Sequence, residues 1–214
     1  MKITDACVYP YPNGDSSVRR MALEAQSLGF DRLVAADTPP GEFYGIEVCT
    51  GILIRGTPLK DLINRVKRER IGDAVVSAEA GDNGFNRAVI TLKGVHIIRG
   101  IQSAEKNAFD HVTARMAADN RVAIDLDLSP LVSGRGITRQ RAMHKFRDVL
   151  TLEQRFEFPL TISSHAHSIL DMRAVREITA LCSLIGMDIP GVENAFSGVD
   201  IITASPDPAV KVIR

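Results

Sequence analysis

The sequence predicts an α/β fold in which about seven to eight parallel strands, surrounded by helices, close into a (β/α) barrel. Short aliphatic segments and amphipathic helical segments alternate along the chain about seven times, as successive βα units do. No linker or low-complexity run divides the 214 residues, so we expect one domain over 1–214. An open doubly wound sheet would show the same alternation, but this number of units in a chain of this length favours the barrel. In either case functional residues are expected at the carboxyl ends of the strands.

Strands are predicted where short aliphatic runs end at Gly, Pro, Asn or Asp. In chain order they are 3–9, 32–36, 46–55, 74–78, 95–98, 121–128 and 159–163, with one more at 199–203. Helices are predicted where apolar residues recur at helical spacing. They are 16–28, 58–70, 85–92, 109–120, 138–156 and 171–185, followed by a short helical turn from 192.

Capping residues set several of these boundaries. Asp15 or Ser16 is expected to cap the first helix because its side-chain oxygen can accept a hydrogen bond from a free amide. Thr57-Pro58 is expected to open the second helix, since proline suits the first helical position. Gly29 and Gly186 are expected to end helices, because glycine enters the left-handed conformation without strain.

The segment 109–131, FDHVTARMAADNRVAIDLDLSPL, is the clearest helix–strand unit. The helix places Ala108, Val112 and Met116 on one face. The strand then alternates strictly, so its two faces meet different surroundings. One face carries Val122, Ile124, Leu126 and Leu128, and the other carries Ala123, Asp125 and Asp127. Parallel strands covered by helices are usually apolar throughout, so two carboxylates on one face need a structural or functional explanation.

Composition sets the broad class. Lys and Arg together number 26, as do Asp and Glu, so only local patches of charge can attract a nucleic acid. Cys7, Cys49 and Cys182 are far apart and odd in number, which argues against a disulfide framework and favours a reducing compartment. No apolar run is long enough to span a bilayer. The start, MKITDACVYP, is typical of a strand rather than of a signal peptide, and we expect a cytoplasmic protein.

The expected strand ends supply the candidate chemistry. They carry Tyr9, Asp37, Arg55, Glu79, His96, Arg99, Asp125, Asp127 and the segment 163–167. His165 and His167 are two residues apart, a spacing that metal sites use, and Glu79, Asp125 or Asp127 could complete such a site. The alternative is a pair of exposed loop histidines. The common nucleotide-binding, hydrolase and protease motifs do not occur.

Two groups of basic residues could contact phosphates. His111 and Arg115 lie one helical turn apart beside the apolar stripe, although His111 could equally be a partly buried histidine bonded to a backbone carbonyl. The densest basic run is Arg135, Arg139, Arg141, Lys145 and Arg147. Arg141 and Lys145, four residues apart, share a helical face. Such a face is often merely solvated, but its position after a strand-end loop favours contact with a phosphate backbone.

Three segments carry a resemblance to a known family. They are FDHVTARMAADNRVAIDLDLSPL, RQRAMHKFRDVL and PLTISSHAHSILDMRAVREITALCSLIGM, and they resemble the archaeal RNase P protein component 3 family, shared with eukaryotic nuclear RNase P. The resemblance covers most of the chain and is clearest over 95–187. It implies a TIM-like barrel related to the PHP superfamily of metal phosphoesterases. It also implies a non-catalytic subunit of the ribonucleoprotein that removes 5′ leaders from precursor tRNA.

The resemblance further implies partners. They are the RNase P RNA, protein component 2 in a two-plus-two heterotetramer, the other RNase P protein subunits and, for the holoenzyme, precursor tRNA. The RNA subunit would use magnesium for the hydrolysis, so no cofactor is expected on this chain. His111 matches the family's DHV motif, Arg141 the arginine that opens the long helix, and Arg176 the arginine of the late helix. The residues expected to contact RNA are Arg99, Lys106, His111, Arg115, Arg141, Lys145 and Arg176, and none is expected to be catalytic.

One departure keeps an alternative open. PHP phosphoesterases carry an HxH at the end of the first strand, where this chain has Asp5-Ala-Cys-Val-Tyr9, which implies loss of the ancestral metal site. His165 and His167 are additions to the family pattern, so a PHP-like metal phosphoesterase is the alternative function. A third interpretation is an assembly scaffold with little RNA contact.

Overall fold

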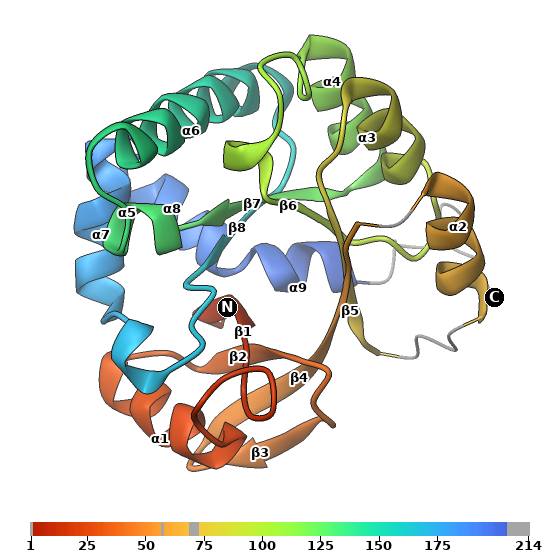
Figure 1. Ribbon diagram of the computed structural model, residues 1–214. Coiled ribbons are helices and arrows are strands. Elements are labelled where there is room, and N and C mark those ends of the chain that lie inside the picture. The colour runs from red at the N-terminus through yellow and green to blue at the C-terminus, as the bar shows by residue number, and fades with distance from the viewer. Residues whose placement is uncertain (1, 57, 69–72, 205–214) are drawn as a thin grey trace, which may run out of the picture.

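The parallel strands lie side by side in a ring with helices outside it, as the computed structural model shows for residues 2–56, 58–68 and 73–204 (Figure 1). The sheet has eight strands in the order β1-β2-β4-β5-β6-β7-β8, with β3 paired antiparallel to β4 outside this path. The strands are β1 (Thr4–Val8), β2 (Arg32–Ala36), β3 (Gly41–Phe43), β4 (Ile46–Ile54), β5 (Val75–Glu79), β6 (Ile97–Arg99), β7 (Ala123–Asp127) and β8 (Leu160–Ser163). The fold is therefore the predicted TIM-like barrel.

Helices follow the strands, and most of them cover the outside of the ring. They are α1 (Val18–Leu28), α2 (Leu59–Arg68), α3 (Asn83–Ile90), α4 (His111–Asn120), α5 (Ser129–Val132), α6 (Gly136–Phe156), α7 (Val175–Leu184), α8 (Ile189–Phe196) and α9 (Gly198–Thr203), with 3-10 turns η1 (Ile101–Ser103) and η2 (Ile169–Asp171). Among the described residues, no helix is both long and apolar enough to cross a membrane.

The seam between β1 and β8 closes the ring. Val8 and Ala166 form an isolated parallel bridge, and the Tyr9 N–H donates to the Ala166 carbonyl at 2.8 Å. The pairing of β1 with β2 shifts register between Asp5 and Val8. The carboxylate of Asp5 accepts hydrogen bonds from the amides of Cys7 at 3.2 Å and Ser164 at 3.0 Å. A side chain thus supplies the acceptor at a point where the strand ladder is irregular.

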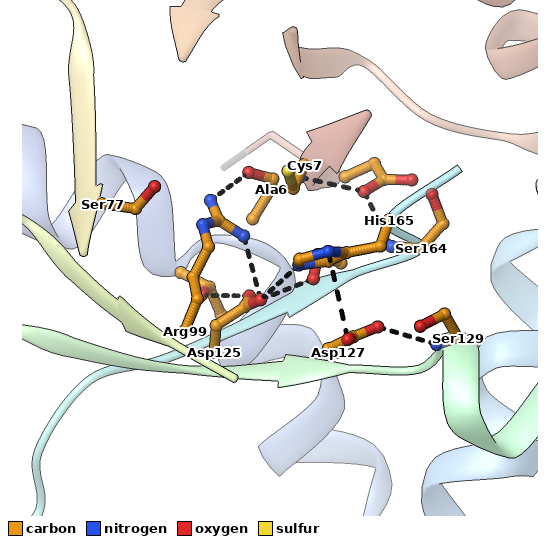
Figure 2. A network of polar contacts seen from close by, with 12 residues as sticks. Ala6, Cys7, Ser77, Arg99, Asp125, Asp127, Ser129, Ser164 and His165 are labelled. Atoms are coloured by element: carbon orange, nitrogen blue, oxygen red, sulfur yellow. Dashed lines mark hydrogen bonds and ion pairs between the residues drawn. The ribbon is translucent and has the colours of Figure 1, made fainter. Parts of the chain in front are cut away.

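The core has two layers, as the alternation in 122–128 predicts. Ile124, Leu126 and Leu128 belong to the large cluster between strands and helices. Ala123 instead faces the barrel interior, in a cluster with Ala6, Val34, Val75, Ile97, Val199 and Ile202. Asp125 and Asp127 follow Ala123 at two-residue spacing on β7, and Figure 2 shows both directed toward His165.

The segment 199–203 is helical, so the prediction of a strand there is wrong. Val199 and Ile202 of α9 fill the amino-terminal end of the barrel, and α9 crosses the ring in Figure 1. Asp200 forms an ion pair with Arg32, which also bonds Glu47 at 2.7 Å. A β-branched run favours a strand locally, but burial of two residues one turn apart selects the helix.

Other boundaries differ by small amounts. Ser17, rather than Asp15 or Ser16, caps α1, accepting from the Arg20 amide. Gly29 ends α1 with φ 92°, and Gly186 has φ 93° just after α7, as expected of both. The proposed cap Thr57 and the end of the helix predicted at 58–70 lie outside the described residues. The sequence did not predict β3, α5 or η2.

Candidate functional site

Arg99 lies inside the carboxyl-terminal mouth of the barrel, where its guanidinium meets the carboxylate of Asp125 at 2.9 Å (Figure 2). The second terminal nitrogen donates to the carbonyl of Ala6 at 2.6 Å. Asp125 also accepts the hydroxyls of Thr161 at 2.8 Å and Ser163 at 2.6 Å. This network explains the inward carboxylate of β7, because a buried charge needs a paired and hydrogen-bonded environment.

The network sets the ionisation of its carboxylates. Burial by itself would raise the pKa of Asp125, but Arg99 and then His165 outweigh it and lower that pKa to about 2. Burial raises the pKa of Asp5 to about 6, and its Oδ2 has no hydrogen-bond partner among the described residues. Burial disfavours the charge on Arg99, but Asp125, together with Cys7 and Tyr9, more than offsets this and raises the Arg99 pKa. One buried aspartate is thus held ionised, and the other is poised to bind a proton.

His165 and His167 have different surroundings. The ring of His165 lies 3.4 Å from Asp125 and 3.9 Å from Asp127. His167 is exposed, stacks on Tyr9 with ring centroids 4.3 Å apart, and has its Nδ1 2.9 Å from the Asn13 carbonyl. The metal site suggested by their spacing is not assembled: within the described residues, no group of three or more His, Cys, Asp or Glu side chains is placed to hold a metal ion.

The prediction that Arg99 contacts RNA is corrected by its position. Arg99 is 2% exposed, and its two terminal nitrogens are engaged inside the barrel. A position at the end of a strand is consistent with either an inward or an outward side chain, and the choice depends on the barrel interior. Arg99 is therefore a structural counter-ion of Asp125.

Tyr9 and Arg55 flank the mouth. Arg55 donates to the Tyr9 hydroxyl, and its guanidinium carbon lies 5.2 Å from the ring centroid. The Tyr9 hydroxyl also lies 3.4 Å from His165 Nδ1. Burial raises the pKa of Tyr9, so its hydroxyl stays protonated. The sequence placed Tyr9 and Arg55 at strand ends, but their mutual contact is a tertiary feature.

A basic pocket of about 540 Å³ opens beside the mouth, between η1, α5 and the first half of α6. We call it the basic pocket; it is lined by Gln102, Ser103, Ala104, Pro130, Thr138, Gln140, Arg141, Ala142, His144 and Lys145. Among the described residues, no carboxylate belongs to this lining. Lys145 donates to the carbonyl of Glu105 at 2.7 Å, and Lys106 is the next residue in the chain. Burial lowers the pKa of Lys145, Asp148 opposes that effect, and Lys106 adds to it.

A hydrogen bond joins the basic pocket to the interior network. The amide nitrogen of Gln102 donates to Asp127 at 2.7 Å, which turns its buried, unpartnered Oε1 away from that carboxylate. Asp127 also accepts the Ser129 amide at 2.9 Å and so holds the start of α5. Sequence reasoning missed Gln102, which follows β6 with no recognisable pattern. It also missed His144, although the spacing from Arg141 could have found it.

The remaining predicted residues lie at the surface. Lys106 and Arg141 are exposed close to the basic pocket or in its lining. His111 and Arg115 are exposed on α4, which packs against α6, so the interpretation of His111 as a partly buried residue is wrong. Arg115 makes a 3.9 Å ion pair with Asp119 in the next turn. Arg176 is exposed in the first turn of α7.

Comparison with known sequences gives a consistent result. The model of the family described as RNase P subunit p30 matches residues 2–200. Ribonuclease P protein component 3 of Methanococcoides burtonii is 30% identical over 86% of this chain and 79% of its own length. The component 3 protein of Haloarcula marismortui is also 30% identical, over 89% of this chain and 85% of its own length.

Solved structures share the fold. A chain in the cryo-EM structure of archaeal ribonuclease P with mature tRNA superposes with a TM-score of 0.75 at 22% identity, over 98% of both chains. A crystal structure of an uncharacterized protein superposes with a TM-score of 0.62 at 10% identity, over 94% of this chain and 73% of that one. At these identities the likeness establishes the barrel architecture.

Proposed function

This chain belongs to the RNase P subunit p30 family, and from that premise we propose that, as a protein subunit of ribonuclease P, it supports the RNA that removes the 5′ leader from precursor tRNA. The observation that carries this conclusion is the family match over residues 2–200. The holoenzyme is an endoribonuclease of tRNA maturation, and this chain is its non-catalytic component.

The geometry of the barrel mouth supports a non-catalytic role. Arg99 is directed at Asp125, and His165 lies between Asp125 and Asp127, so these side chains satisfy one another. Metal-dependent phosphoesterases instead need several convergent ligands with an open coordination position. We assign the hydrolysis, and the magnesium it uses, to the RNA subunit and no cofactor to this chain.

We assign RNA contact to the cations around the basic pocket, of which Lys106 and Arg141 are exposed and Lys145 is half-buried. Lys106, Arg141 and Lys145 cluster there, and His111 and Arg115 extend the surface along α4. A pocket lined by donors and free of carboxylates suits an RNA phosphate, because each neutralised phosphate releases bound counterions. Arg176 would form a separate contact on α7. Arg99 is not in this set.

The proposed partners follow the family. They are the RNase P RNA, protein component 2 in a two-plus-two heterotetramer, and the other RNase P protein subunits, with precursor tRNA as the substrate of the holoenzyme. The proposed setting is the cytoplasm of an archaeal cell, where transfer RNA is processed. The three free cysteines suit a reducing compartment.

Reconstitution tests the function. Precursor-tRNA cleavage is measured with the cognate RNase P RNA and component 2, with and without this chain, over a range of magnesium concentrations. We expect the chain to reduce the magnesium concentration that cleavage needs, because protein cations lower phosphate repulsion. Unchanged magnesium dependence, or cleavage by the chain without RNA, would contradict the proposal.

A further inference from the structure

A groove of about 610 Å³ lies at the opposite end of α6 from the basic pocket. We call it the acidic groove; it is lined by Leu150, Glu153, Gln154, Glu157, Phe158, Pro159, Leu160, Gly186, Met187, Asp188, Pro190, Gly191, Asn194, Ala195 and Ile201. These residues come from the end of α6, the start of β8, the α7–α8 connection, α8 and α9. The acidic groove lies outside the RNA-contacting surface proposed above.

The floor of the acidic groove is apolar. Phe158, Leu160 and Met187 belong to the main hydrophobic core and are fixed by it. Large apolar side chains also stand at its edge: Ile201 is 44% exposed, and Ile189, between two lining residues, is 64% exposed. A well-supported apolar floor with exposed aliphatic side chains beside it is the form that a protein-binding surface takes.

The rim of the acidic groove carries one sign of charge. Glu153, Glu157 and Asp188 line it, together with no Lys, Arg or His. Within the described part of the chain, none of these carboxylates forms a salt bridge. Burial raises the pKa of Glu153, and Glu157 and Asp188 raise it further. The three carboxylates therefore repel one another, and a cation placed among them would be attracted by all three.

Charge and geometry narrow the choice of occupant. RNA would bring further negative charge to the rim. A second copy docked through the same groove would bring two acidic rims together, since a two-fold contact is self-complementary. Ala204, the last described residue of the chain, lines a separate pocket together with Cys49, Val75 and His96. A different protein remains.

We propose that the acidic groove binds a basic, apolar segment of another RNase P protein subunit, with an aliphatic or aromatic side chain on the floor and Lys or Arg side chains against the rim. The identity of the partner class rests on the proposed function. The groove then serves as the anchor of a larger interface, because a stable protein contact buries more surface than one groove offers.

Charge reversal tests the rim. The double variant Glu153→Lys and Glu157→Lys is titrated with each purified cognate RNase P protein subunit by calorimetry and with the RNase P RNA by filter binding. We expect affinity for one protein subunit to fall about tenfold or more, with weaker loss in Glu153→Gln and Glu157→Gln, while RNA affinity is not reduced. The matched control Arg141→Ala should weaken RNA binding and leave the protein contact unchanged. Thermal melting followed by circular dichroism verifies that each variant folds. If the double Lys variant does not fold, the double Gln variant carries the test.

Photocross-linking identifies the occupant directly. Ile189 is replaced by p-benzoylphenylalanine, and the assembled holoenzyme is irradiated. Cross-linking to another protein subunit through a Lys- or Arg-containing peptide supports the proposal. Cross-linking to RNA, to a second copy or to residues 205–214 of the same chain overturns it, as does wild-type affinity of both groove variants for every subunit. If the wild-type chain does not stimulate cleavage in any reconstitution, the proposed function fails; if it does and the groove variants behave like wild type, only the groove proposal fails.

Discussion

The two ends of α6 differ in charge and in what lies beneath them. The first half of the helix lines the basic pocket and the second half lines the acidic groove; among the described residues, the pocket lining includes no carboxylate and the groove lining no cation. The zero net charge of the chain is thus compatible with local patches of opposite sign. A balanced total says little about nucleic-acid binding when one 21-residue helix borders sites of both signs.

The two sites also differ in the part of the protein that supports them. The basic pocket is connected through Gln102 and Asp127 to the charged interior of the barrel, whereas the acidic groove rests on Phe158 and Leu160 of the hydrophobic core. The basic end should therefore respond to substitutions in the charged interior of the barrel, and the acidic end to changes of charge at its rim.

The charges at the end of α6 only partly suit the helix dipole. Arg155 in the last turn interacts favourably with the negative partial charge there, whereas Glu153 in the same turn and Glu157 just after the helix interact unfavourably with it. Glu153 and Glu157 therefore cost some helix stability, as residues kept for binding do.

Replacing Arg99 with Met should have the largest effect on this comparison. It leaves Asp125 buried without its counter-ion, so we expect the free energy of unfolding to fall by about 3–5 kcal/mol. Arg141→Met, at the exposed rim of the basic pocket, should stay within about 0.5 kcal/mol of wild type. Urea unfolding measures both. Equal effects of the two substitutions would show that the buried Arg99–Asp125 ion pair does not stabilise the barrel as inferred.

The pH dependence of stability tests the difference between the charged barrel interior beside the basic pocket and the hydrophobic core beneath the acidic groove. Asp5 has a folded pKa of about 6 against 3.8 in the unfolded chain, so its stabilising effect is complete below pH 3.8 and is lost as pH rises through 6. Asp5→Asn should remove this loss. Between pH 4 and pH 8, the free energy of unfolding of the variant should therefore rise by about 2–3 kcal/mol relative to that of wild type. Thermal unfolding at the two pH values provides the measurement. If the difference in unfolding free energy between Asp5→Asn and wild type were the same at pH 4 and pH 8, the raised pKa of Asp5 would be contradicted.

Removing Arg141 and Lys145 together tests the basic end. We expect RNA affinity to fall about tenfold and the slope of log affinity against log salt to decrease by about two, because two phosphate contacts are lost. Filter binding at several salt concentrations measures both quantities. Glu153→Gln with Glu157→Gln is the matched control at the other end of α6 and should not weaken RNA binding. An unchanged salt slope in the Arg141 and Lys145 variant would place the RNA elsewhere.

The smallest expected effect concerns the end of α6. Glu157 follows the helix in the left-handed conformation, with φ 55°, and is a carboxylate at the negative pole of the dipole. Glu157→Gly should therefore raise the free energy of unfolding by about 1 kcal/mol while weakening the protein contact proposed for the acidic groove. Chemical denaturation and calorimetry test the two halves of this prediction. Glu24→Gly, at a half-buried site inside α1, should instead destabilise the protein.

Much of the barrel could be predicted from local pattern. Alternating strand and helix segments predicted the parallel sheet, and the strict alternation in 122–128 predicted two unlike faces for β7. Gly29 and Gly186 ended helices as expected because their role depends only on the local backbone. The segment 199–203 was predicted wrongly, since its helix is selected by the barrel interior that Val199 and Ile202 fill.

The candidate sites could be predicted only in part. Arg141 and Lys145 were found because helical spacing alone places them on one face, and the family resemblance marked the same helix. Arg99 was misplaced, because its direction depends on Asp125, 26 residues away. Gln102 and the acidic groove went unnoticed, since each combines residues from elements distant in the sequence.

The sequence by itself determined the parallel strands of the barrel, most of the helices between them, the glycine ends of two helices and the family, because these depend on short-range periodicity and on motifs in the chain. Only the tertiary structure decided which charges are buried, how Asp5 closes the seam and how α6 separates a basic pocket from an acidic groove. The physical reason is that burial and charge pairing are set by neighbours in space, and closing the ring brings β1 beside β8 from opposite ends of the chain.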